Sequence, residues 1–147
     1  MKKYTTILTN ILTLLLCVSC GSDDAEFVRL EEIPQWNVNS AKYQSSMQVV
    51  CTVNSESLKI GDEENDMIGA FINGECRGIV IKPVSTEDNL QSLFYLVIMG
   101  NQDDEDEKVE LKLFDFSQMR LELSDTNLVF KESKKVGSVS DPLKLNV

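Results

Sequence analysis

Histidine is absent from the sequence, and its absence argues against several kinds of catalytic site. Histidine is the usual base beside a serine or cysteine nucleophile, and it is a frequent zinc ligand. The sequence also lacks the Gly-x-Ser-x-Gly elbow of serine hydrolases and the Gly-x-x-x-x-Gly-Lys loop that binds phosphates. Because no activated nucleophile or base can be named, we expect a protein that is not an enzyme and that holds no cofactor.

Basic residues are scarce: the 147 residues include 14 Lys and Arg against 24 Asp and Glu, which gives a net charge of −10. Lys2 and Lys3 lie in a segment, residues 1–19, that we expect to be removed. The remaining 128 residues then hold 12 basic and 24 acidic side chains, a net charge of −12. Such an acidic chain is not expected to bind nucleic acid, or to bind anionic lipid headgroups by charge.

Residues 1–19 have the layout of a secretory signal peptide. A positively charged start is followed by an apolar stretch, residues 7–18, that is too short to cross a bilayer. The sequence Val18-Ser19-Cys20 resembles the lipobox of bacterial lipoproteins, in which the cysteine is lipidated and becomes the new N-terminus. The resemblance implies a chain anchored by lipid at Cys20 in the outer membrane. An ordinary secreted protein, cut near the same place, is the alternative.

Residues 20–35 are predicted to form an acidic tether in front of a folded domain at 36–147. The tether starts with Gly21-Ser22-Asp23-Asp24-Ala25-Glu26, which resembles the surface-export signal of Bacteroidota lipoproteins. This resemblance implies display on the cell surface, whereas a solvated linker without a sorting role is the alternative. The length of the remaining chain suits one domain with a real core.

The folded part alternates apolar and polar residues with a period of two, as β-strands do. A central strand is expected at 92–100, because this stretch is apolar on both faces. We predict about eight strands and no long helix. The strands are expected at 46–53, 67–72, 75–81, 92–100, 108–115, 120–124, 127–131 and after Pro142. This spacing predicts an all-β fold: a single antiparallel β-sandwich, immunoglobulin-like or jelly-roll-like, with a closed barrel as the alternative.

Asn73-Gly74 separates two of these strands and is the strongest short signal for a β-hairpin, because a type I′ turn needs positive φ at two successive residues. A two-residue turn is expected to place Phe71 opposite Cys76, and Gly69 opposite Gly78. Phe71 and Cys76 are expected to face the core. The paired glycines would leave bare backbone for a large ring to cover, or would permit a bulge. The candidates for that ring are Trp36, Phe94 and Phe114.

Two cysteines remain in the folded part, Cys51 and Cys76. Both are expected on apolar strand faces, in an oxidising compartment, so they are the candidates for a disulfide. Two separate thiols packed as small apolar groups are the alternative. Neither is expected to be a nucleophile, because no histidine is present to activate it.

Candidate binding residues are few. Of the available rings, Trp36, Tyr43, Tyr95 and Phe116, core packing is favoured for most, and Trp36 and Tyr43 are the candidates for a ligand site. The acidic stretches 62–66 and 103–107 offer carboxylates of the kind that calcium prefers, but they lack EF-hand spacing, and solvated charge runs are favoured. The candidate calcium ligands are Asp62, Glu64 and Asp66.

The stretch IGAFINGECRG, residues 68–78, resembles the most specific element of a recurrent extracellular module of Bacteroidota surface proteins. Weaker matches, such as YQSSMQVVCTV, FYLVIMG and DPLKL, extend the resemblance over about residues 36–147, although Asp106 stands where a glycine is usual. The resemblance implies a β-sandwich surface module with no established activity. We therefore expect a noncatalytic cell-surface lipoprotein for adhesion or envelope protein assembly. A glycan-binding accessory lipoprotein is the alternative.

Overall fold

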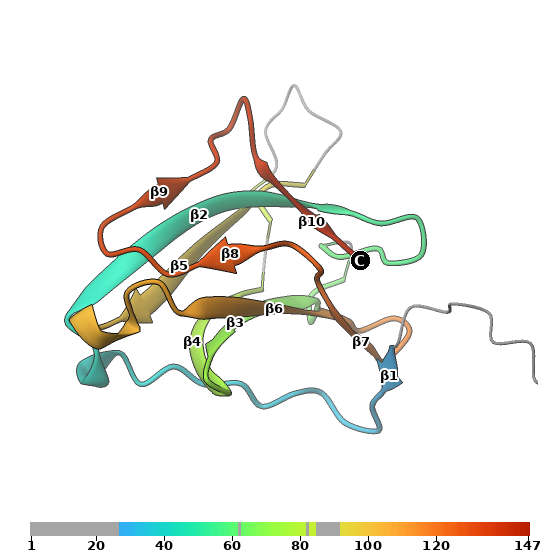
Figure 1. Cartoon of the computed structure of the whole chain (residues 1–147). Coiled ribbons are helices and arrows are strands. Elements are labelled where there is room, and N and C mark those ends of the chain that lie inside the picture. The colour runs from blue at the N-terminus through green and yellow to red at the C-terminus, as the bar shows by residue number, and fades with distance from the viewer. Residues whose placement is uncertain (1–26, 62, 82, 85–91) are drawn as a thin grey trace, which may run out of the picture.

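The computed structural model describes residues 27–61, 63–81, 83–84 and 92–147. In these residues two β-sheets pack face to face, and the helical elements are two short 3-10 turns, η1 (Ser40–Lys42) and η2 (Gln102–Asp104) (Figure 1). The strands are β1 (Val28–Arg29), β2 (Ser45–Asn54), β3 (Met67–Ile72), β4 (Glu75–Val80), β5 (Phe94–Gly100), β6 (Lys108–Asp115), β7 (Arg120–Leu123), β8 (Leu128–Val129), β9 (Lys135–Val136) and β10 (Leu143–Asn146). The predicted all-β sandwich is confirmed, and the described strands do not close into a barrel.

Sheet A has the strand order β1-β7-β6-β3-β4, and sheet B has the order β10-β2-β5. Two short strands extend these sheets: β8 pairs with β6, and β9 pairs with β2. β7 and β8 share one edge of β6, because β7 pairs along 112–115 and β8 along 108–109. In the same way β9 and β10 share one edge of β2. Both run parallel to β2, so the sandwich is mostly rather than wholly antiparallel.

The core lies between the two sheets and is built from alternate residues of the long strands. Sheet B contributes Met47, Val49, Cys51, Phe94, Leu96 and Ile98, and sheet A contributes Ile68, Ala70, Ile72, Val109, Leu111 and Leu113. The alternation predicted for 46–53 and 108–115 is confirmed, because Gln48 and Glu110, at intervening positions, are exposed.

The hairpin turn between β3 and β4 has the predicted conformation. Asn73 and Gly74 have φ angles of 50° and 78°, and Phe71 pairs with Cys76 as expected. Beyond this pair the register shifts by one residue, because Arg77 is an extra residue in β4 and forms a β-bulge.

The predicted pairing of Gly69 with Gly78 is wrong, because the bulge shifts the register between β3 and β4. Gly69 pairs with Ile79 and Gly78 pairs with Ala70, so the two glycines are not opposed. Gly78 instead faces sheet B, where a Cβ would overlap the carbonyl oxygen of Val97 in β5. The lack of a side chain at Gly78 therefore lets β4 and β5 approach closely.

Phe71 lies on the outer face of sheet A and not in the core, so the predicted orientation of the hairpin is wrong. The N-terminal segment, residues 27–39, crosses this outer face (Figure 1). Within the segment, the Trp36 ring meets Phe71 edge-on, with 5.4 Å between ring centres. Trp36 also lies over Gly69, where a Cβ would come within 2.8 Å of the indole. The ring that covers a strand glycine is therefore Trp36, one of the three candidates.

The packed part of the chain begins before the predicted boundary at Trp36. β1 lies within 20–35, the range predicted to be a tether, and it pairs in antiparallel fashion with β7. The predicted signal peptide, Cys20 and the acidic start of the predicted tether lie outside the described residues.

Candidate functional site

The two rings predicted at a ligand site are both engaged within the fold. Trp36 is half-buried against Gly69 and Phe71. The face of the Tyr43 ring is covered by the Arg77 guanidinium, whose carbon lies 4.3 Å from the ring centre. Burial raises the pKa of the Tyr43 hydroxyl, so this group stays neutral. A ring that stacks on a ligand needs an open face, and both rings are packed against protein groups.

Arg77, the extra residue of the bulge, turns inward and forms a buried ion pair with Asp104. Its Nη1 and Nη2 atoms lie 3.0 and 3.1 Å from the two carboxylate oxygens of Asp104. The same carboxylate accepts a hydrogen bond of 2.8 Å from the backbone N–H of Asn101, the N-cap residue of η2. The pair joins β4 of sheet A to the turn that follows β5 of sheet B. Its role is therefore to hold the two sheets together.

The acidic residue Asp66 also serves the fold. Its carboxylate accepts two hydrogen bonds from N–H groups of its own loop, at 2.8 and 3.0 Å, and one of 2.9 Å from the N–H of Phe116. Of the other calcium candidates, Glu64 is exposed and Asp62 lies outside the described residues. In the described part of the chain, no three Cys, Asp or Glu side chains gather in a way that could hold a metal ion.

Cys51 and Cys76 are free thiols, so the expected disulfide is not formed. Cys51 points from sheet B into the core. Cys76 is half-buried and pairs with Phe71, which places it on the outer face of sheet A. Sheet A therefore separates the two sulfur atoms.

Both thiols are expected to react slowly with iodoacetamide while the protein is folded. Burial raises the pKa of the Cys51 thiol to about 12, and burial also raises the pKa of Cys76. Because the thiolate is the reactive form, at pH 8 we expect no alkylation of Cys51, slow alkylation of Cys76, and fast alkylation of both in urea. Mass spectrometry of the chain lacking residues 1–20, prepared without reductant, measures this. Resistance to alkylation in urea, reversed by reductant, would contradict the free thiols.

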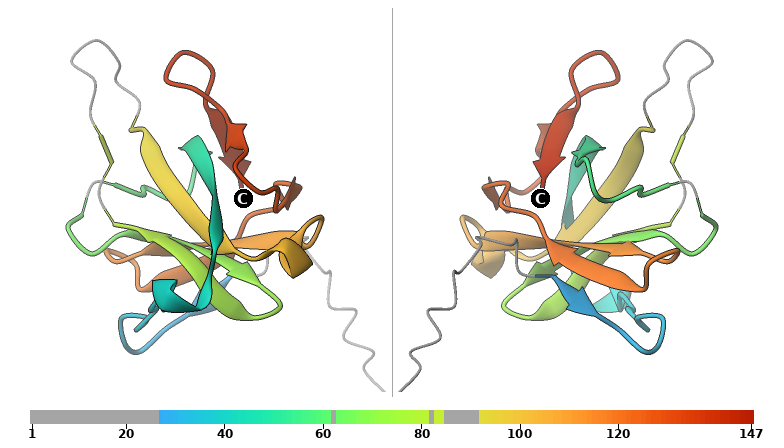
Figure 2. Two further views of the ribbon diagram at one scale, coloured as in Figure 1. Left: turned by 90° about the vertical axis from the view of Figure 1, so that its left-hand side faces the viewer. Right: turned by 90° about the vertical axis from the view of Figure 1, so that its right-hand side faces the viewer.

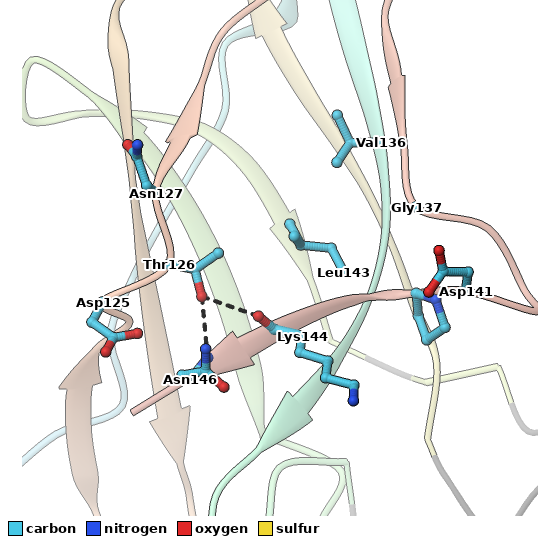
Figure 3. A pocket seen from close by; sticks show the side chains of 10 residues that line it. Asp125, Thr126, Asn127, Val136, Gly137, Asp141, Leu143, Lys144 and Asn146 are labelled. Carbon is cyan, nitrogen blue, oxygen red and sulfur yellow. Dashed lines mark hydrogen bonds between the residues drawn. The ribbon is translucent and has the colours of Figure 1, made fainter.

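A shallow groove of about 710 Å³ opens between an edge of sheet A and an edge of sheet B (Figure 3). Its lining residues are Asp125, Thr126, Asn127, Val136, Gly137, Asp141, Pro142, Leu143, Lys144 and Asn146. Thr126 Oγ1 bridges the two edges: it donates to the carbonyl of Lys144 and accepts from the N–H of Asn146, both at 3.1 Å (Figure 3). The lining is rich in carboxylate and amide groups and contains no aromatic ring, so it suits a polar ligand.

The outer face of sheet B carries exposed apolar side chains. β5 ends this sheet and pairs with β2, so the central position predicted for 92–100 is wrong. Tyr95 and Val97 point away from the core and are 44% and 47% exposed. Val84, which pairs with Leu93 just before β5, is also exposed. We call Val84, Tyr95 and Val97 the sheet B patch.

A second group of exposed apolar residues lies at the β1 edge of sheet A. We call Phe27, Val28, Leu121 and Leu123 the sheet A rim; Val28 and Leu123 are 53% and 58% exposed, and Leu121 between them is half-buried. The leucines of β7 face outward, since Leu121 pairs with Phe114, and Arg120 and Glu122 form an ion pair on its other face. A hollow of about 390 Å³ lies between Val28, Leu121, Leu123 and Lys112. Sequence reasoning found neither apolar surface, because it assigned apolar strand residues to the core.

Comparisons of the chain with protein-family models, with curated proteins and with solved structures found no match. In the described part of the chain, no helix is both long and apolar enough to cross a membrane. The functional argument therefore rests on the two apolar surfaces and the polar groove.

Proposed function

We propose that the chain is a noncatalytic lipoprotein module, anchored through Cys20 at the outer-membrane surface, that serves adhesion or envelope assembly by binding another protein. The observation that carries this proposal is the exposure of Tyr95 and Val97 on one face of an edge strand. Neighbouring apolar side chains gain free energy when a partner removes them from water.

The order of the layers favours sheet B as the binding side. The N-terminal segment, which leads back to Cys20, crosses the outer face of sheet A, and sheet B lies on the other side of the core (Figure 2). A domain tethered at Cys20 would therefore present the sheet B patch away from its attachment.

Val97→Lys is expected to weaken partner binding by at least about tenfold, because a charge in a desolvated apolar contact costs more than 1.4 kcal/mol. The measurement is competition by the soluble variant against labelled wild-type chain, both lacking residues 1–20, for detergent-solubilised outer-membrane proteins of the same cell. Leu123→Lys is the matched control, because it makes the same change at an exposed strand residue of the other sheet. Equal competition by Val97→Lys and wild type would contradict the proposal.

Glycan binding is the second candidate, and the polar groove favours it more than Trp36 or Tyr43 does. Carboxylate and amide side chains are suitable partners for sugar hydroxyls. A glycan-array screen separates the two functions. Saturable binding that is lost in Asn127→Ala and Asp141→Ala, but kept in Val97→Lys, would make glycan recognition the main function.

A further inference from the structure

We infer that the sheet A rim rests on the lipid surface to which the chain is anchored, and that this contact orients the domain. The inference rests on the lipidation of Cys20 given under the proposed function. It goes further, because a lipid anchor alone leaves a domain free to turn on its tether.

The rim is apolar on both sides of the sheet edge. β1 is the last strand of sheet A, and successive residues of a strand point to opposite faces. Val28 pairs with Leu121 and shares its outer face, whereas Phe27, just before β1, lies with the Arg120 guanidinium carbon 4.0 Å from its ring centre; both residues are exposed. Leu123, on the outer face of the neighbouring strand β7, is 58% exposed. The N-terminal segment covers the rest of this outer face through contacts such as Trp36 on Gly69, but it leaves the rim open.

The short tether between Cys20 and Phe27 indicates that the surface in contact with the rim is the lipid bilayer. Seven residue steps separate Cys20 from Phe27, and they span at most ~25 Å when fully extended. The register of β1 with β7 shows that the chain, followed backward from Arg29 to Val28, runs toward the Leu123 end of β7. The chain therefore leaves the domain at the rim itself. A bilayer that holds the lipids on Cys20 lies within the reach of this short tether.

The chemistry of the rim suits the boundary between headgroups and acyl chains. Phenylalanine, valine and leucine side chains gain free energy in that region. Lys112, beside Leu123 and Val28 in the hollow, holds its ammonium 4.3 Å from the centre of the Phe71 ring, so the apolar side chains carry the contact. So few apolar side chains would not hold the acidic chain on a membrane alone. The tether makes the contact effective by keeping the rim at a high local concentration near the lipid.

The test places an environment-sensitive fluorescent amino acid at position 123 or, as the matched control, at position 97. The full lipidated protein is reconstituted into phosphatidylethanolamine–phosphatidylglycerol vesicles that contain nitroxide-labelled lipid. Mass spectrometry of the N-terminal peptide first establishes the acyl chains on Cys20. We expect quenching at position 123 to exceed quenching at position 97 several-fold.

Each outcome bears on a different claim. An acylated, vesicle-bound protein without quenching at position 123, or with equal quenching at both positions, would overturn this inference and leave the anchor in place. A chain without acyl groups would overturn both the anchor and this inference. Quenching at position 97 alone would reverse the orientation and contradict the proposed binding side.

A second experiment controls for the apolar character of the probe. The probe is placed at Val28, and the Leu123→Glu variant is compared with the protein that keeps Leu123. We expect Leu123→Glu to reduce the quenching at position 28 by at least half. Unchanged quenching would show that the probe itself enters the lipid, and it would overturn the inference.

Discussion

Asp104→Ala is expected to lower the free energy of unfolding by about 3–5 kcal/mol, the largest effect of any substitution considered. The change removes the close partner of the buried Arg77 guanidinium, which keeps only Glu75 at 3.7 Å, and it removes the acceptor for the N–H of Asn101. A buried charge that loses its partner keeps its desolvation cost without compensation. Urea unfolding, followed by the fluorescence of the single tryptophan and by circular dichroism, measures the loss.

The neighbouring Asp103 provides the matched control for this experiment. It is exposed and lies in the same turn, so Asp103→Ala is expected to change stability by no more than about 0.5 kcal/mol. Similar losses in the two variants would mean that the Arg77–Asp104 pair does not hold the sheets together.

Gly78→Val is expected to destabilise the protein by about 3 kcal/mol. A Cβ at this position would overlap the backbone carbonyl of Val97, and backbone cannot turn aside as a flexible side chain can. The sheets would have to move apart where β4 meets β5. Differential scanning calorimetry and urea unfolding measure the effect.

Gly74→Ala is the control, because it replaces a glycine at a position where the new side chain meets no other group. A Cβ there meets nothing within 4 Å, although the φ of 78° gives an alanine a strain of about 1 kcal/mol. If Gly78→Val cost no more than Gly74→Ala, the close approach of the two sheets would not be a constraint on the fold.

Strands with one face in the core could be predicted from the sequence, because their alternation of apolar and polar residues has one physical cause. Along 46–53 and 108–115 one face meets the core, and Gln48 and Glu110 on the other face reach water, so these polar residues mark the outer face directly. The Asn73-Gly74 turn was predictable for a local reason too, since few residue pairs adopt two positive φ angles.

The orientation of β3 and the place of β5 could not be predicted in this way. β3 is buried on both faces, because the segment around Trp36 covers its outer side, and a strand of this kind shows no alternation. β5 has a similar apolar sequence, yet its outer face with Tyr95 and Val97 is open. Whether a second layer covers a strand depends on distant segments, and strand periodicity carries no information about them.

The roles of Asp66 and Asp104 could not be predicted for a related reason. Asp66 bonds to Phe116, 50 positions away, and Asp104 bonds to Arg77, 27 positions away. The bulge that turns Arg77 inward shifts the register by one residue, which the sequence pattern does not reveal. Carboxylates that resemble metal ligands or solvated charges therefore act as internal hydrogen-bond acceptors.

The central claim is that the anchored domain binds another protein through sheet B and faces lipid with sheet A. Light-activated cross-linking on living cells tests this claim most directly. The full chain carries benzoylphenylalanine in place of Val97 or of Leu123. We predict a discrete protein adduct at position 97 that excess soluble domain suppresses, and lipid adducts without that protein at position 123. The same protein adduct at position 123, with none at position 97, would contradict the account.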